Sequence, residues 1–181
     1  MHKELAKKDK VTRRIPWIPI VLVAFVGVLI ILAISENRSQ KRMRESAYRL
    51  VCGTRLAGLG RTMREYCDEF HEYPAPDKWC DLLSEYAELS EDDFKCSANK
   101  GARCGFAMNP AAHPDGPPDM VVLFEAKGGW NQYGGPELLT LENHREMRCH
   151  VFFNDGQVRF VRAEEIAELN WKGEEKGKRI E

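Results

Sequence analysis

The chain has 181 residues, with 27 basic and 28 acidic side chains and a formal net charge of -1. Because both signs are scattered along the chain, nothing in its charge would attract a polyanion, and nucleic acid is excluded as an expected partner. Without a membrane segment and the charged ends, about 130 residues remain, which suits one compact domain with a modest core.

An apolar segment of membrane length, residues 15–34, stands near the N-terminus and contains no charged residue. At helical rise this segment spans about 30 Å, the thickness of the hydrocarbon core of a bilayer. Pro16 and Pro19 fall in its first turn, where a missing amide donor is tolerated, and Trp17 stands where an aromatic ring meets lipid headgroups. We therefore predict a transmembrane helix over 15–34.

More Lys and Arg side chains precede this segment than follow it. Residues 1–14 carry six Lys or Arg side chains, and residues 35–44 carry four. The bias predicts a cytoplasmic basic tail at 1–14 and a single-pass protein of the cell (inner) membrane, with the lipid bilayer as its first partner. The 6 cysteines all follow the span, which agrees with an extracytoplasmic, oxidising location for the C-terminal domain. The alternative is a signal peptide cleaved near Ala33 and Ser35, although the apolar part of such peptides is shorter, about 7 to 15 residues.

The segment after the span has the pattern of one amphipathic helix. No proline occurs between residues 36 and 70, and apolar side chains recur alternately four and three residues apart, at Cys52, Leu56, Leu59, Met63, Tyr66 and Phe70. We predict a stem helix over 35–73 that ends at Tyr73 and Pro74. The stripe is expected to pack on its own domain; self-association through the stripe is the alternative.

Residues 74–171 are predicted to form an extracytoplasmic α+β domain. Asp77 is expected to cap a short helix that carries Trp79. Ser90 followed three residues later by Asp93 has the pattern of a capping box and predicts a further helical turn.

The remaining elements are strands and a final helix. Apolar runs typical of strands occur at 120–124, 149–153 and 157–161. The turn residues Asn154–Gly156 between the last two runs predict a β-hairpin. A helix is predicted over 163–170, and 172–181 is predicted to be a charged, flexible tail. A long helix followed by a small antiparallel sheet is an α+β arrangement in which the helix covers one face of the sheet.

This architecture resembles that of type IV pilins and of the pseudopilins of type II secretion. Residues 118–161 read PDMVVLFEAKGGWNQYGGPELLTLENHREMRCHVFFNDGQVRFV and are similar to the C-terminal region of pilin-like proteins of planctomycetes. Those proteins carry a histidine followed after about nine residues by Asp-Gly; here ten residues separate His144 from Asp155 and Gly156. The segments CGTRLAGLGRTMREY (52–66) and DKWCDLL (77–83) resemble the stem and the next helix of that group. The resemblance implies a pilin-like fold and a structural subunit that meets other pilin-like subunits or envelope proteins.

The N-terminal region departs from the prepilin pattern. Prepilins have a glycine at the cleavage point, then an aromatic residue or methionine, and a glutamate at the fifth mature position. This chain has Arg13, Arg14, Ile15, Pro16 and Trp17 there and no acidic residue within 15–34. The resemblance therefore covers the fold and does not extend to prepilin processing or polymerisation.

Several disulfides are compatible with the spacing of the cysteines. On one helix, Cys52 and Cys67 would be about 22 Å apart, far beyond the roughly 7 Å that a disulfide tolerates. Cys96 and Cys104, around an Asn-Lys-Gly turn, are the first predicted pair, and Cys67 with Cys80 across the proline turn is the second.

Metal ions and catalysis are not predicted. A zinc site is the alternative use of the cysteines, but its four candidates lack a close Cys-x-x-Cys pair: Cys96, Cys104, Cys149 and His150. Asp115 and Asp119 bracket a loop that could hold calcium, although calcium needs six or more oxygens and solvated loop acids are the expected reading. His144 and Asp155 are predicted to fix the hairpin rather than to act as an acid and a base. No motif of a hydrolase, metalloprotease or nucleotide-binding loop occurs, so we predict a non-enzymatic protein without a cofactor.

A glycine-flanked loop, 128–135, carries two large rings. Trp130, Asn131 and Tyr133 are a possible recognition surface, and the alternative is that the rings fold back on the domain. The chain is thus expected to be a membrane-anchored, pseudopilin-like structural subunit of a cell-envelope or secretion assembly. The alternative is a stand-alone anchored module that binds a ligand or a protein through this loop.

Overall fold

A computed structural model describes residues 17–99, 101–145 and 147–174. The predicted basic tail 1–14, the first two residues of the predicted span and most of the tail 172–181 lie outside them. The chain divides into two compact units, Met1–Arg42 and Met43–Glu181. One continuous helix, α1 (Trp17–Phe70, 54 residues), begins in the first unit and ends in the second.

The first unit is represented by the apolar part of α1. From Val21 to Ile34 its large apolar side chains are between 47% and 73% exposed. By length and composition this helix can cross a membrane, which agrees with the predicted span. Pro19 is the third residue of α1 and lies in its first turn, as expected for a proline in a helix.

The apolar segment and the predicted stem form one helix, α1, although this helix ends earlier than expected. The last residue of α1 is Phe70, three residues before Tyr73. His71 adopts a left-handed conformation (φ 63°) while its amide still donates to the carbonyl of Cys67. This left-handed residue, rather than the steric effect of Pro74, ends the helix.

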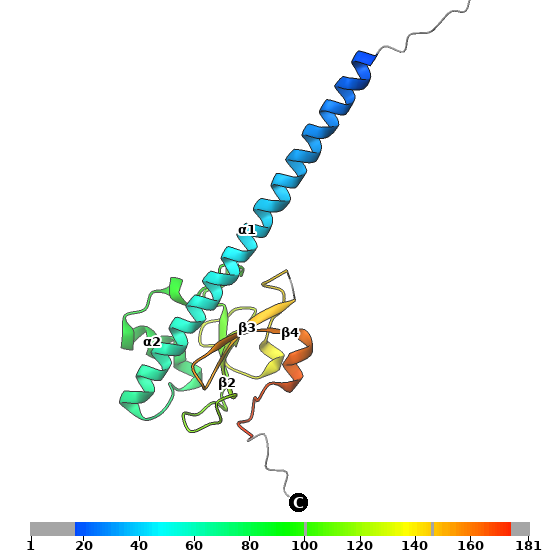
Figure 1. The fold of residues 1–181 in the computed structure, drawn as a ribbon. Helices are drawn as coiled ribbons and strands as arrows, with labels where there is room; N and C mark the ends of the chain where they lie inside the picture. Colours follow the sequence, from blue (N-terminus) through cyan, green and yellow to red (C-terminus); the bar gives the residue numbers. More distant parts are fainter. Residues whose placement is uncertain (1–16, 100, 146, 175–181) are drawn as a thin grey trace, which may run out of the picture. The chain divides into compact units, whose positions relative to one another are not determined.

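The second unit contains a four-stranded antiparallel sheet in the order β1-β2-β3-β4 (Figure 1). The strands are β1 (Phe106–Met108), β2 (Val121–Glu125), β3 (Arg148–Phe153) and β4 (Val158–Arg162). The predicted hairpin is confirmed: β3 and β4 pair directly, and Gly156 takes the positive φ (82°) of a tight turn. Sequence analysis missed β1, because only three residues form it.

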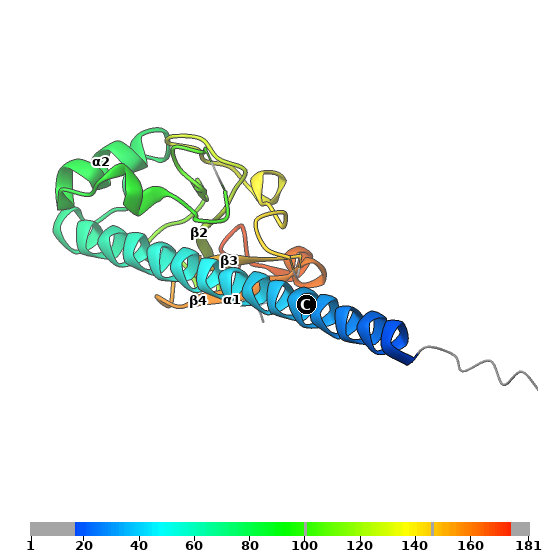
Figure 2. The same cartoon turned by 90° about the horizontal axis from the view of Figure 1, so that it is seen from above.

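One face of the sheet is covered by α1, whose C-terminal part lies along β3 and β4 (Figure 2). The predicted stripe provides the contact, because Leu56, Leu59 and Met63 are buried in one core cluster with Val122 and Phe152. The prediction that the stem helix packs on its own sheet is therefore confirmed. The chain is α+β, with a long apolar N-terminal helix and a small antiparallel sheet.

The opposite face of the sheet is covered by irregular segments. Its buried side chains are contacted by residues at the end of, or just after, two short 3-10 helices, η3 (Pro136–Leu138) and η4 (Ala163–Glu168). The second core cluster consists of Ala107, Val121, Phe124, Ala126, Cys149, Val151, Phe153 and Val161. The helix predicted over 163–170 is thus a shorter 3-10 segment.

Three short helices complete the unit beside α1: η1 (Pro76–Lys78), α2 (Trp79–Ala87) and η2 (Glu91–Phe94). The capping box predicted from Ser90 and Asp93 is present at η2. The cap predicted from Asp77 is wrong, because this residue lies inside η1 and the N-terminus of α2 is capped from a distant loop, as described below.

Candidate functional site

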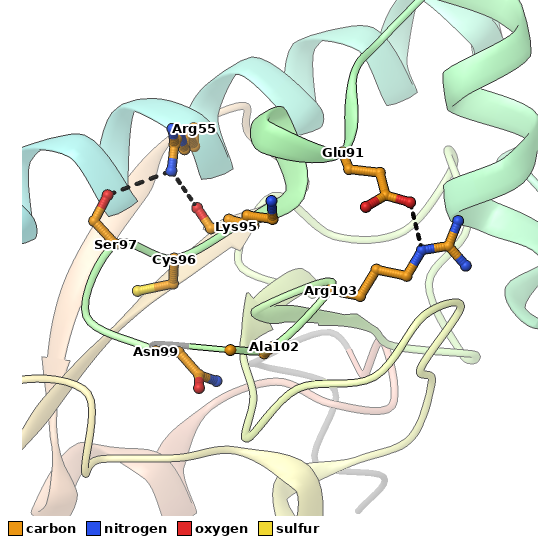
Figure 3. Close-up of a pocket in the computed structure, with 9 residues that line it drawn as sticks. Arg55, Glu91, Lys95, Cys96, Ser97, Asn99, Ala102 and Arg103 are labelled. Carbon is orange, nitrogen blue, oxygen red and sulfur yellow. Dashed lines mark hydrogen bonds and ion pairs between the residues drawn. The ribbon is translucent and has the colours of Figure 1, made fainter.

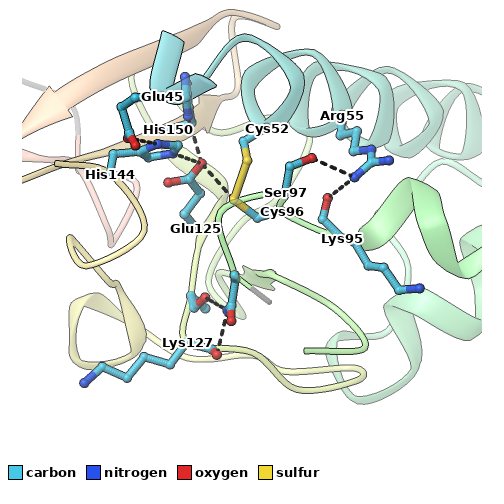
Figure 4. Close-up of a disulfide and its surroundings, with 12 residues drawn as sticks. Glu45, Cys52, Arg55, Lys95, Cys96, Ser97, Glu125, Lys127, His144 and His150 are labelled. Atoms are coloured by element: carbon cyan, nitrogen blue, oxygen red, sulfur yellow. Dashed lines mark hydrogen bonds and ion pairs between the residues drawn. A yellow bond between two sulfur atoms is a disulfide. The ribbon is translucent and has the colours of Figure 1, made fainter. Parts of the chain in front are cut away.

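The most unusual polar group of the chain is the carboxylate of Glu125, the last residue of β2. It is fully buried, and its Oε1 atom lies 2.8 Å from His150 Nδ1 and 3.0 Å from His144 Nε2 (Figure 4). Sequence analysis did not identify this residue. Its only signal was an acidic residue within an apolar run, between Phe124 and Ala126.

Strand alternation places this cluster on the α1 side of the sheet. Along β2, Leu123 faces the core beneath α1, so Glu125, two residues on, shares that face. On β3, His150 shares the same face with Phe152. His144 precedes β3 and completes the cluster from a loop.

The helix α1 closes the cluster from above the sheet. Glu45 of α1 places Oε1 3.6 Å from His144 Nδ1, on the ring edge opposite Glu125. The rings of His144, His150 and Phe160 pack against one another, with centroids between 4.5 and 5.4 Å apart; both contacts of the His144 ring are edge-to-face. The site is therefore a polar cluster in the core, with the side chain of His144 only 1% exposed.

The surroundings of Glu125 and His144 favour the charged form of both side chains. Burial alone would raise the pKa of Glu125, but the hydrogen bonds from His144 and His150 outweigh burial, and the pKa lies below its ordinary value. Burial alone would lower the pKa of His144, but the hydrogen bond and charge of Glu125, with the charge of Glu45, raise it. Within the part of the chain that the structure describes, Glu125 Oε2 and His144 Nδ1 are buried without a hydrogen-bond partner.

A disulfide lies against this cluster. It joins Cys52 of α1 to Cys96, which follows η2, and its Cys96 Sγ atom lies 3.8 Å from Glu125 Oε1 (Figure 4). The first predicted pair, Cys96 with Cys104, is therefore wrong. The sulfur partner of Cys96 comes instead from α1, 44 residues earlier, because the helix crosses the sheet at this point.

The second predicted pair, Cys67 with Cys80, is also wrong. Both thiols are free, and Cys80 Sγ lies 4.0 Å from the free thiol of Cys104. The exclusion of a Cys52–Cys67 bridge agrees with the structure, since both residues lie on α1. The zinc set considered from the sequence is not assembled, because Cys149 belongs to the core on the other face of the sheet. Burial raises the pKa of the Cys149 thiol, which keeps it protonated at neutral pH.

The two parts of the His…Asp-Gly motif serve different places. His144 bonds to Glu125 on β2, whereas Asp155 and Gly156 form the β3–β4 turn, in which Asp155 Oδ1 accepts from the amide of Gln157 at 2.9 Å. The prediction that His144 bonds within the hairpin is therefore corrected. It contacts the hairpin strands through the rings of His150 and Phe160.

The loop 128–135 folds back on the domain and holds α2. Asn131 Oδ1 accepts from the amides of Cys80 and Asp81 and thereby caps the N-terminus of α2. Trp130 donates to Asp81 Oδ1 at 2.6 Å and packs on Phe94, with 5.0 Å between ring centroids. Of the three residues proposed for recognition, Tyr133 alone has a largely exposed ring, at 49%.

The two loop acids considered for calcium are not arranged as a cage. Asp115 and Asp119 line one open surface pocket with His113, and Asp119 Oδ1 accepts from Asn170 Nδ2 at 3.0 Å. The carboxylate of Asp119 is thus already used to hold the chain near the C-terminus.

A basic surface pocket of about 490 Å³ opens beside the disulfide (Figure 3). Arg55 lies across it and donates to the carbonyl of Lys95 at 2.8 Å, while Arg103 pairs with Glu91 at 2.7 Å. Cys96 is among the residues that line the pocket, although its own exposure is only 2%.

No protein-family model, curated protein or solved structure matches this chain. Its function is therefore inferred from its own residues and their arrangement.

Proposed function

We propose that this protein is a non-enzymatic, membrane-anchored, pilin-like structural subunit of a cell-envelope or secretion assembly. The observation that carries the proposal is α1. Its first part is apolar and exposed, and the same unbroken helix then provides the buried stripe that covers an antiparallel sheet. One helix thus contains both the apolar anchor segment and the stripe that packs on the sheet, the arrangement that the pilin-like resemblance implies.

The chemistry of the buried cluster supports a structural role. Glu125 and His144 are enclosed between α1 and the sheet and bond to one another, so a substrate has no access to them. The disulfide beside them joins α1 to the domain, and disulfides persist in oxidising compartments. Together with the basic residues of 1–14, this supports an inner-membrane protein with a cytoplasmic N-terminus and an extracytoplasmic domain.

The buried stripe of α1 is occupied by its own sheet, so assembly requires another face of the helix. Met43 and Leu50 are exposed apolar residues on α1, at 62% and 71% exposure, and their spacing of seven residues places them on one face of the helix. We infer that subunits, or a partner envelope protein, contact this face. A stand-alone binding module is less well supported, because Trp130 and Asn131 of the loop 128–135 are used to hold α2.

Photo-crosslinking in intact membranes tests the proposal. A photoreactive amino acid at Leu50 is expected to trap oligomers or a defined envelope partner, and the same group at the exposed control position Glu164 on η4 is expected to trap neither. Crosslinks from Tyr133 but not from Leu50 would favour the stand-alone binding module instead. No product from Leu50 at native expression would overturn the proposed assembly role.

A further inference from the structure

Four potential metal ligands converge in the core. The sulfur atoms of Cys52 and Cys96, a carboxylate oxygen of Glu125 and a ring nitrogen of His144 all lie within 4.8 Å of one another, and all four residues are buried. Tetrahedral zinc with bonds of about 2.0 to 2.3 Å places its ligand atoms roughly 3.3 to 3.8 Å apart. Small side-chain movements would therefore bring these atoms to zinc geometry once the two sulfurs are no longer bonded.

Residues next to these four are placed to orient them as metal ligands. Histidine ligands of zinc commonly direct their second ring nitrogen at a carboxylate, and His144 Nδ1 already faces Glu45 Oε1 at 3.6 Å. His150 Nδ1, at 2.8 Å from Glu125 Oε1, would orient the ligating carboxylate. The buried oxygen Glu125 Oε2 has no hydrogen-bond partner among the described residues, and coordination would satisfy it.

We propose that Cys52, Cys96, Glu125 and His144 bind a zinc ion when the disulfide is reduced, so that the disulfide and the zinc ion are alternative states of one site. Two thiolates, one imidazole and one carboxylate form a ligand set that zinc accepts. In the oxidised state the charged pair of Glu125 and His144 occupies the space beside the disulfide.

In this proposal the reductant enters through the basic pocket, which Cys96 lines. Because Cys96 is only 2% exposed, the wall of the pocket must move before its sulfur atom is reached. A dithiol reductant attacks Cys96 Sγ as a thiolate, the S–S bond breaks, and Cys52 leaves as a thiolate. The second thiol of the reductant then resolves the mixed disulfide, so the reductant leaves oxidised and the protein has gained two electrons and two protons. Zinc binding displaces these two protons from the thiols. Arg55 and Arg103 line the pocket, and their positive charges favour the attacking thiolate.

The experiment uses the full chain in detergent, oxidised or reduced with a phosphine. We expect reduced protein to bind one zinc ion per chain against a chromophoric chelator, and oxidised protein to bind none. The oxidised form is the matched control for Cys67, Cys80, Cys104 and Cys149, because these thiols are free in both states. Cobalt in place of zinc should give a thiolate-to-metal charge-transfer band in the reduced form alone.

Zinc binding by single-residue variants tests which residues form the site. Cys52→Ser should abolish reduction-dependent binding, whereas Cys149→Ser, on the other face of the sheet, should retain it. Glu45 is a positioning residue, and Glu45→Gln should weaken zinc binding about 10- to 100-fold. If Cys52→Ser fails to fold, X-ray absorption of the zinc-loaded wild type decides, with two sulfur and two nitrogen or oxygen ligands expected. Zinc affinity that is equal in both redox states, or a site with three or four sulfur ligands, would overturn the proposal.

Discussion

Gly60 of α1 lies directly against the ring of Phe152 on β3, so close that a Cβ atom on residue 60 would overlap the ring. This contact sets how closely the helix approaches the sheet. We expect Gly60→Ala to destabilise the domain by about 1 to 3 kcal/mol, because the helix or the ring must move. Gly58 is the matched control: its Cβ would meet nothing within 4 Å, and alanine there should stabilise the helix by up to about 1 kcal/mol. Denaturant unfolding of the two variants measures both effects, and equal shifts of the same sign would contradict the close contact.

Leu59 of α1 is part of the hydrophobic core between the helix and the sheet. It is 2% exposed, and Leu59→Ala should lower the free energy of unfolding by about 2 to 5 kcal/mol through lost burial and a cavity. Leu50→Ala, at a residue that is 71% exposed, should change stability by less than about 0.5 kcal/mol. Thermal melts measure stability, and crosslinking measures assembly. The reverse pattern, with Leu59→Ala stable and Leu50→Ala unfolded, is incompatible with the core described here.

The elements that could be predicted from the sequence are those with local causes. The apolar part of α1 follows from an uncharged apolar run, its stem from alternating spacings of three and four residues, and the β3–β4 hairpin from a turn that contains Gly156. β1 could not be predicted, because its three residues become a strand only by pairing with β2, some fifteen residues later.

The polar cluster escaped prediction for the same reason. Glu125 is separated by 19 residues from His144 and by 25 from His150, and neither spacing marks a helix face or a turn. The disulfide partners are 44 residues apart, so short sequence separation favoured Cys104 over Cys52 as the partner of Cys96. The pairing of β2 with β3 brings Glu125 beside His150, and the path of α1 across the sheet brings Cys52 to Cys96. Asn131 illustrates the same limit, since a loop residue caps α2 from about fifty residues away.

The cap provided by Asn131 can be tested separately. Asn131→Ala should cost about 1 kcal/mol, because the amides of Cys80 and Asp81 lose their acceptor. Tyr133→Ala, in the same loop, should be close to neutral, since its ring is largely exposed. The melting temperatures of the two variants give the comparison. A larger loss from Tyr133→Ala would show that the loop is held by its exposed ring instead.

The disulfide should be visible in the unreduced protein. Peptide mapping after alkylation is expected to give a peptide that links Cys52 to Cys96, with the other four cysteines alkylated. In the chain-entropy account, a bridge across 44 residues stabilises the domain by about 4 kcal/mol. Metal-free reduced protein should therefore unfold at lower denaturant than oxidised protein. A peptide that links Cys96 to Cys104 would contradict the structure.

The pair formed by Glu125 and His144 predicts how the stability of the oxidised, metal-free protein depends on pH. The pKa of His144 is raised, so its contribution is complete below its ordinary value of 6.5 and is lost as the pH rises through the higher folded-state value. The pKa of Glu125 is lowered, so its contribution is complete above its ordinary value of 4.5 and is lost as the pH falls through the lower folded-state value.

The free energy of unfolding should therefore contain a maximum from this pair between about pH 4.5 and 6.5. Glu45 on α1 and His150 on β3 also face the pair, and the single substitution His144→Gln leaves both in place. His144→Gln should remove the decline in the free energy of unfolding on the alkaline side of the maximum. His113→Gln, in the open pocket near Asp119, should leave this decline unchanged. Denaturant unfolding from pH 4 to 8 gives both curves. A decline of equal slope in His144→Gln and the wild type would mean that the Glu125–His144 pair is not the charged pair that the geometry indicates.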